Sequence, residues 1–152
     1  MTYKRQQPTA LPSITSFYTP DGSLRSELLD SVARKLGEAF EKSPRRGGQY
    51  YVSSTQLRRF YNDVKQLQDK IQKHLIDKGI PEDSQDPGAL QPYLALVKML
   101  KAKVAYARRP GMTERVSPEF KKTIDECIEL VQSPRDFQAF VLFFEAIVGY
   151  YY

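Results

Sequence analysis

The feature that most restricts the fold of this chain is a run of apolar residues with helical spacing. Between positions 57 and 75, apolar side chains recur at steps of three and four, at Leu57, Phe60, Val64, Leu67, Ile71 and Leu75. This period places them on one face of an α-helix. Ser53 precedes the run as an N-cap, and Gln56 completes a capping box. We therefore predict a helix that begins after Ser53, ends near Lys78 and buries this face.

Four further segments show helical patterns. Apolar spacing predicts one helix over about 23–40 and another from Gln91 or Pro92 to Arg108, before Pro110-Gly111. Ser117-Pro118 and Ser133-Pro134 each join an N-cap residue to a proline at the first helical position, and predict a fourth and a fifth helix. No segment shows the sustained alternation typical of strands. We predict an all-α fold, a compact bundle of about five helices.

The two ends of the chain differ in character. Residues 1–20 contain three prolines among serines and threonines, and predict a flexible N-terminal tail that is tied down only locally. Residues 21–152 are predicted to form a single helical-bundle domain. The last helix is apolar on almost every side between Phe137 and Val148. Such a helix is expected to lie at the centre of a bundle or to be covered by another chain.

Basic residues are concentrated in two windows. The net charge is +5, but residues 42–62 and residues 87–113 each contain five basic and no acidic residues. This segregation is typical of a surface that binds a polyanion. The alternative is chance clustering on a solvated surface. The candidate nucleic-acid-binding residues are Arg45, Arg46, Arg58, Arg59, Lys65, Lys98, Lys101, Lys103, Arg108 and Arg109.

Arg58 and Arg59 are the most distinctive of these candidates. They lie in the first turns of the helix after Ser53, where a cation is slightly unfavourable against the helix dipole. Their position therefore suggests a use beyond helix stability. Arg45 and Arg46 precede Gly47-Gly48 in a loop, which we expect to be mobile until a partner binds.

The sequence offers little for catalysis. Gly47-Gly48 is not followed by the lysine and hydroxyl residue of a phosphate-binding loop. His74, the only histidine, lies at the edge of an apolar stripe, and Cys127, the only cysteine, lies within one. We predict no catalytic residue, no metal and no cofactor. A single cysteine fits a reducing cytoplasm, and no apolar run is long enough to span a bilayer.

Three segments together resemble one known protein family. They are residues 53–61 (SSTQLRRFY), residues 98–108 (KMLKAKVAYAR) and residues 136–151 (DFQAFVLFFEAIVGYY). In this order they are similar to the helix-opening motif, the basic helix and the carboxyl-terminal helix of the small helical subunit of type III-A CRISPR effector complexes, the Csm complexes. The resemblance spans roughly residues 50–152, and the first segment is its most specific part.

The resemblance implies a non-catalytic, RNA-binding subunit. In that family, copies stack head to tail into a minor filament, beside a major filament of backbone subunits that hold the guide RNA. The implied partners are guide RNA, target RNA, further copies of the chain, the backbone subunit and the large polymerase-like subunit. Target cleavage belongs to the backbone subunit, and the DNase and cyclic-oligonucleotide activities belong to the large subunit. Contacts to the RNA backbone suffice, because base pairing supplies the specificity.

Two other interpretations stay open. The basic faces could meet acidic surfaces of partner proteins, which would make the chain a helical protein-interaction adaptor without direct contact to nucleic acid. A DNA-binding regulator would need a short helix-turn-helix unit, and the connections between the predicted helices do not show one clearly. The sequence leaves undecided the copy number and whether the basic residues contact target, guide or both.

Overall fold

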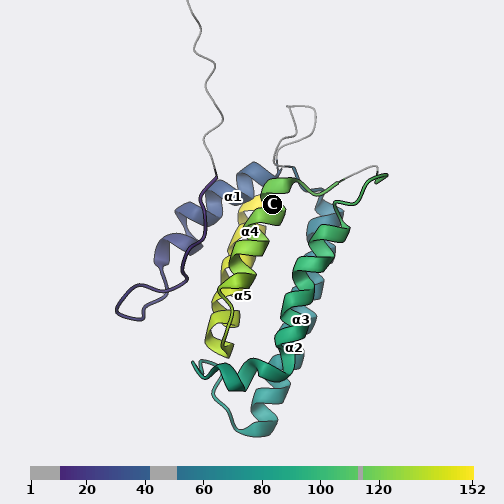
Figure 1. The fold of residues 1–152 in the computed structure, drawn as a ribbon. Coiled ribbons are helices and arrows are strands. Elements are labelled where there is room, and N and C mark those ends of the chain that lie inside the picture. Colours follow the sequence, from purple (N-terminus) through teal and green to yellow (C-terminus); the bar gives the residue numbers. More distant parts are fainter. Residues whose placement is uncertain (1–10, 42–50, 113–114) are drawn as a thin grey trace, which may run out of the picture.

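The computed structural model of the protein describes residues 11–41, 51–112 and 115–152, and it is a helical bundle (Figure 1). A short 3-10 helix, η1 (Ser26–Leu29), precedes five α-helices. These are α1 (Ser31–Glu41), α2 (Ser54–Lys78), α3 (Pro87–Tyr106), α4 (Pro118–Glu129) and α5 (Pro134–Tyr151). An isolated antiparallel bridge joins Tyr18 to Leu24, and the described residues contain no β-strand. The predicted all-α bundle of about five helices is confirmed.

Helix α5 lies at the centre of this arrangement. It packs against α1, α2, α3 and η1, while α2 and α3 run side by side in opposite directions (Figure 1). Nine of its 18 residues are buried, although Leu142 keeps 42% of its surface exposed. The rings of Phe40, Phe60, Phe120, Phe140 and Phe144 form a connected cluster, with neighbouring centroids 5.2–6.4 Å apart. The core therefore joins α1, α2, α4 and α5.

Helix α3 begins earlier than predicted. Its N-cap is Asp86, whose carboxylate accepts a hydrogen bond from the Gly88 amide at 3.0 Å, and Pro87 opens the helix. The predicted start at Gln91 or Pro92 was therefore wrong. Proline inside a helix removes one backbone hydrogen bond and bends the axis, and Pro92 lies inside α3. Figure 1 shows the first part of α3 turned away from its long straight part.

The amino-terminal region also differs from the sequence-based expectation. The single helix predicted over 23–40 is divided at Asp30 into η1 and α1. Within the predicted tail 1–20, residues 11–20 lie against the bundle, with Ile14 and Phe17 buried in its core. The Ile14 amide donates to the Glu126 carboxylate at 2.6 Å. This segment therefore packs as part of the fold, and residues 1–10 lie outside the described ranges.

Candidate nucleic-acid interface

The start of α2 is held by contacts from three directions. The Ser53 hydroxyl accepts a hydrogen bond from the Gln56 amide at 3.1 Å, and the Gln56 side chain accepts one from the Ser53 amide at 3.4 Å. This confirms the predicted capping box. The Val52 amide donates to the Phe40 carbonyl at 2.9 Å, and the Tyr151 hydroxyl donates to the Val52 carbonyl at 2.6 Å. The first turn of α2 is thus attached to α1 and α5.

Arg58 and Arg59 project from the next turn of α2, directly after this anchored turn. Both are exposed. Within the described ranges, neither guanidinium forms an ion pair or a hydrogen bond with another residue. Their charge is therefore available to an external anion, and a guanidinium presents a fork of donors that matches phosphate.

The lysines of α3 have closer acidic neighbours than the sequence suggests. Lys101 forms an ion pair with Glu129 of α4, and Lys103 Nζ lies 3.4 Å from the Asp63 carboxylate of α2. The hydrogen bond to Glu129 raises the pKa of Lys101, and the same bond, with the nearby charge of Lys98, lowers the pKa of Glu129. The basic window of the sequence is therefore interleaved with acidic residues in space.

Three other candidates also have partners. Lys65 Nζ lies 2.8 Å from the Glu145 carboxylate of α5, and this contact raises the pKa of Lys65. Arg108 donates to the Val116 carbonyl at 2.6 Å. Arg109 donates to the Tyr106 carbonyl at 3.0 Å, and its guanidinium carbon lies 3.7 Å from the centre of the Tyr106 ring. These three side chains are already oriented by the protein.

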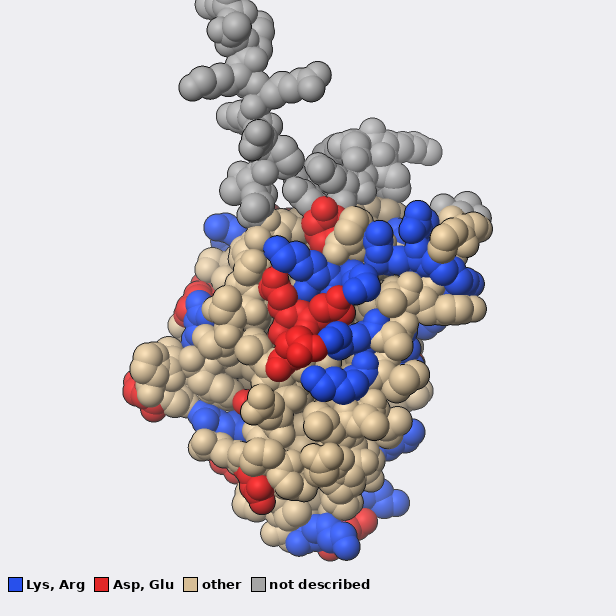
Figure 2. All heavy atoms as spheres, in the orientation of Figure 1, with Lys and Arg blue, Asp and Glu red and all other residues tan. Residues whose placement is uncertain are grey.

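The remaining candidates are Lys98, Arg45 and Arg46. Lys98 is exposed, and it forms no ion pair with any residue that the structure describes. Arg45 and Arg46 lie outside the described residues. Figure 2 shows acidic and basic side chains interleaved over the middle of the face formed by α3 and α4. At the upper right of the same view, where α3 ends, basic side chains gather without acidic ones between them.

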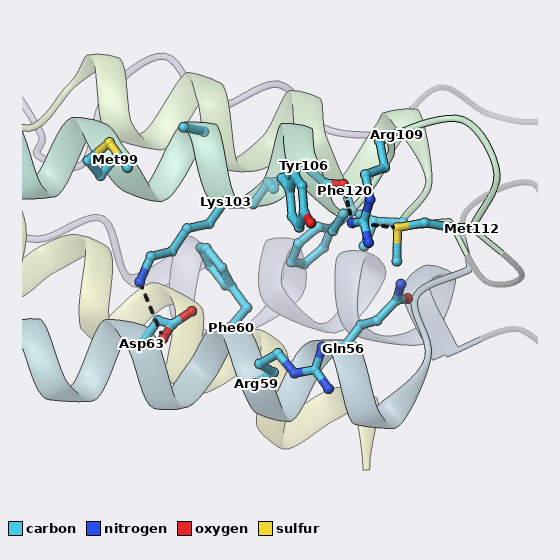
Figure 3. Close-up of a pocket in the computed structure, with 14 residues that line it drawn as sticks. Gln56, Arg59, Phe60, Asp63, Met99, Lys103, Tyr106, Arg109, Met112 and Phe120 are labelled. Atoms are coloured by element: carbon cyan, nitrogen blue, oxygen red, sulfur yellow. Dashed lines mark hydrogen bonds and ion pairs between the residues drawn. The ribbon is translucent and has the colours of Figure 1, made fainter.

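An apolar groove of about 600 Å³ separates the first turns of α2 from the last turns of α3 (Figure 3). Phe60, Met99, Tyr106 and Phe120 line it, and Arg59 and Arg109 also face it. A shallower hollow continues from it over Ser53, Thr55, Pro110 and Gly111. The groove therefore lies beside the basic end of the bundle.

Sequence reasoning missed this groove. Met99 and Tyr106 are large apolar residues that fall outside the buried stripe of α3, and they keep 50% and 65% of their surface exposed. Two large apolar residues off the buried stripe were the available signal. Phe60 and Phe120 gave no signal, because both also belong to the buried faces of their helices.

The single cysteine and the single histidine of the sequence lie beside apolar or aromatic neighbours. Within 11–41, 51–112 and 115–152, no group of three or more His, Cys, Asp or Glu side chains could hold a metal ion. Cys127 is buried in the core, as predicted, and burial raises the pKa of its thiol. His74 is half-buried, with its ring 5.1 Å from that of Tyr93. No described helix is both long enough and apolar enough to cross a membrane.

Comparison with known proteins gives one match. A family model described as Csm2 Type III-A matches residues 23–152. The comparison with curated proteins found no match, and neither did the comparison with solved structures. The matched range contains η1 and all five α-helices. Since it covers most of the sequence, the chain belongs to the Csm2 family, the small subunit of the type III-A CRISPR Csm complex.

Proposed function

We propose that this subunit binds RNA through phosphate contacts at the end of the bundle where α2 begins and α3 ends. The observation that supports this most strongly is the pair Arg58 and Arg59. They are exposed, they have no ion pair with a described residue, and they project from a capped helix attached to α1 and α5. Such preorganised cations bind a polyanion at a smaller entropic cost than cations on a flexible loop.

The candidates form two classes in this proposal. Arg58, Arg59 and Lys98 contact phosphate directly, because none of them has an ion pair within the described part of the chain. Arg109 joins them through its exposed guanidinium. Lys65, Lys101, Lys103 and Arg108 have partners inside the protein. They act mainly through their electrostatic field, while Arg45 and Arg46 remain predicted contacts outside the described residues.

The wider role follows from the family. We propose that the subunit is non-catalytic, self-associates into a filament, and lines guide and target RNA beside the backbone and large polymerase-like subunits. Specificity then comes from base pairing between the RNA strands, so the protein needs to recognise only phosphate and shape. A cytoplasmic location, expected from the single cysteine, remains a prediction.

A second candidate function has its own support. Leu96 and Met99 on α3 and Leu142 on α5 are large apolar side chains that remain substantially exposed. Surfaces of this kind suit contacts with other proteins. A helical adaptor without direct RNA contact would use them, and its basic residues would then meet acidic protein surfaces.

The deciding experiment compares two double variants that remove equal charge from the same helix. Arg58→Ala/Arg59→Ala removes the unpaired arginines, and Lys70→Ala/Lys73→Ala removes two exposed lysines further along α2. Affinity for single-stranded RNA is measured by fluorescence anisotropy from roughly 50 to 200 mM salt. If both arginines contact phosphate, the slope of log affinity against log salt should decrease by about 1.4, at about 0.7 per contact.

The control variant separates local contact from bulk charge. It should change the salt slope much less, and both variants should keep the free energy of unfolding within about 0.5 kcal/mol, as exposed substitutions usually do. An equal loss of RNA affinity in the two variants would contradict the assignment of Arg58 and Arg59 as phosphate contacts. Indifference to RNA even at low salt, with normal assembly into the complex, would favour the adaptor.

A further inference from the structure

The groove between α2 and α3 is left unfilled by the described side chains around it. Its volume of about 600 Å³ falls within the range of roughly 300–1,000 Å³ typical of small-ligand sites. The ion pair of Lys103 with Asp63 spans it from helix to helix on one side, as Figure 3 shows. The core continues beneath it, since Phe60 and Phe120 are buried and meet edge to face at 5.8 Å.

The lining of the groove suits a flat, weakly polar ligand. Tyr106 supplies an exposed aromatic ring and Met99 a polarisable thioether, while the buried Phe60 and Phe120 form the floor. Thioethers and aromatic rings both make favourable contacts with π systems. Tyr106, with 65% of its surface exposed, can be covered by a ligand without any rearrangement of the core.

The mouth of the groove suits an anion. Arg59 faces the groove without an ion pair to a described residue, and the Arg109 guanidinium carbon lies over the Tyr106 ring, 3.7 Å from its centre. The Arg109 guanidinium is fixed further by its bond to the Tyr106 carbonyl and by a contact of 3.1 Å with the Met112 sulfur. An apolar cleft with two arginines at its edge combines the two surfaces that a nucleotide presents.

We propose that this groove accepts one unstacked base of a bound RNA strand, while Arg59 and Arg109 hold the adjoining phosphates. This proposal rests on the proposed RNA-binding function. An apolar protein segment would use the lining but would leave two cations at the mouth without a partner. Charge complementarity therefore favours a nucleotide as the occupant.

The site tolerates any base. The polar groups that face it include Asp63, which already pairs with Lys103, and Gln56. A stacking platform without a fixed set of donors and acceptors binds every base by its π face. Binding should thus depend on the presence of a base and not on its identity.

The test uses the full-length protein and two RNA probes with the same phosphates. One is an oligouridine of about 12 nucleotides, within the site sizes of single-strand binders, and the other replaces its nucleosides with abasic ribose units. The wild-type protein should bind the abasic probe more weakly by roughly 5- to 150-fold, the range expected for a base–aromatic stack. The Tyr106→Ala variant should bind both probes with the low affinity that the wild-type protein shows for the abasic probe.

Two further variants act as controls. Tyr106→Phe keeps the ring and should keep the preference for oligouridine. Leu96→Ala removes an exposed apolar side chain of the same helix outside the groove, and should also leave the preference intact. Thermal unfolding of each variant verifies that the bundle is folded.

The outcomes distinguish this inference from the proposed function. Equal, salt-sensitive binding of both probes by the wild type would overturn the inference and leave the proposed function standing. Binding of neither probe would overturn both. A base preference that survives Tyr106→Ala would place the base outside the groove and overturn the inference. If Tyr106→Ala instead abolished assembly of the complex and left RNA binding unchanged, the groove would belong to a protein partner, and the inference would also be overturned.

Discussion

Gly37 allows α1 to approach α5 at backbone distance. A Cβ atom at this position would lie 2.7 Å from the Ile147 carbonyl oxygen, 2.8 Å from the Tyr150 Cβ and 2.9 Å from the Tyr151 amide nitrogen. Two of these three atoms belong to the backbone of the central helix, so they cannot move away as a flexible side chain would. We expect Gly37→Ala to force the two helices apart.

The size of the effect follows from two opposing contributions. Overpacking a buried contact costs about 1–3 kcal/mol, and three short contacts favour the upper half of that range. Replacing glycine by alanine inside a helix contributes about 1 kcal/mol in the stabilising direction. The free energy of unfolding should therefore fall by about 1–2 kcal/mol. For a domain of this size, the melting temperature should fall by about 2–8 °C.

Gly149→Ala is the matched control. Gly149 lies in α5, and a Cβ atom there would have no neighbour within 4 Å. This variant should raise the free energy of unfolding by about 0.4–1 kcal/mol, through the lower entropy of the unfolded chain. Both variants are measured by urea denaturation followed by circular dichroism. Stabilisation of similar size by both would refute the close approach of α1 to α5.

Two further predictions concern contacts near the candidate interface. Tyr151→Phe should lower the free energy of unfolding by about 1–3 kcal/mol, because it leaves the buried Val52 carbonyl without its donor; an unchanged denaturation midpoint would contradict this. Lys101→Met should raise the pKa of Glu129 towards its ordinary value, measured by carboxyl NMR titration. Since that pKa is lowered in the folded protein, the pair stabilises the fold above pH about 4.3, and its contribution is lost as the pH falls through the lowered pKa. A pKa of Glu129 that does not move in the variant would show that Lys101 is not its main partner.

Local signals were sufficient for most of the architecture. Ser53, Ser117 and Ser133 were each identified as N-caps, and each accepts a hydrogen bond from the amide three residues later. The apolar stripe of α2 was buried as its period indicated. Caps and periodicity are properties of a few neighbouring residues, and for this reason they can be recognised without knowledge of the fold.

The errors arose where distant contacts decide the structure. Ile14 and Phe17 have no periodic pattern around them, and their segment is attached to helices far along the chain, since the Ile14 amide donates to Glu126 of α4. The Tyr18 hydroxyl, for example, donates to the Arg135 carbonyl at 2.7 Å across a separation of 117 residues. The start of α3 was predicted too late, at Gln91 or Pro92, because a proline and a glycine together, as at Pro87-Gly88, usually mark a turn, whereas Asp86 caps the helix there.

In the candidate site, too, local features could be predicted from the sequence and long-range contacts could not. The placement of Arg58 and Arg59 near the rigid start of α2 depended on the capping box, which is local. The partners of Lys65 and Lys101 could not be foreseen, because Glu145 and Glu129 lie 80 and 28 residues away in sequence. A tally of charge along the chain counts every lysine equally, whereas the structure separates paired from unpaired cations.

The difference between paired and unpaired cations determines how RNA would compete with the protein's own ion pairs. A phosphate that binds Lys101 or Lys103 must displace Glu129 or Asp63, or share the lysine with it. Pairs this exposed contribute little to stability because solvent screens them, so the exchange is possible but yields little net attraction. Arg58 and Arg59 have no such competitor within the described chain. Affinity should therefore depend far more on the two arginines of α2 than on the paired lysines Lys101 and Lys103 of α3, a difference that residue counts alone would not indicate.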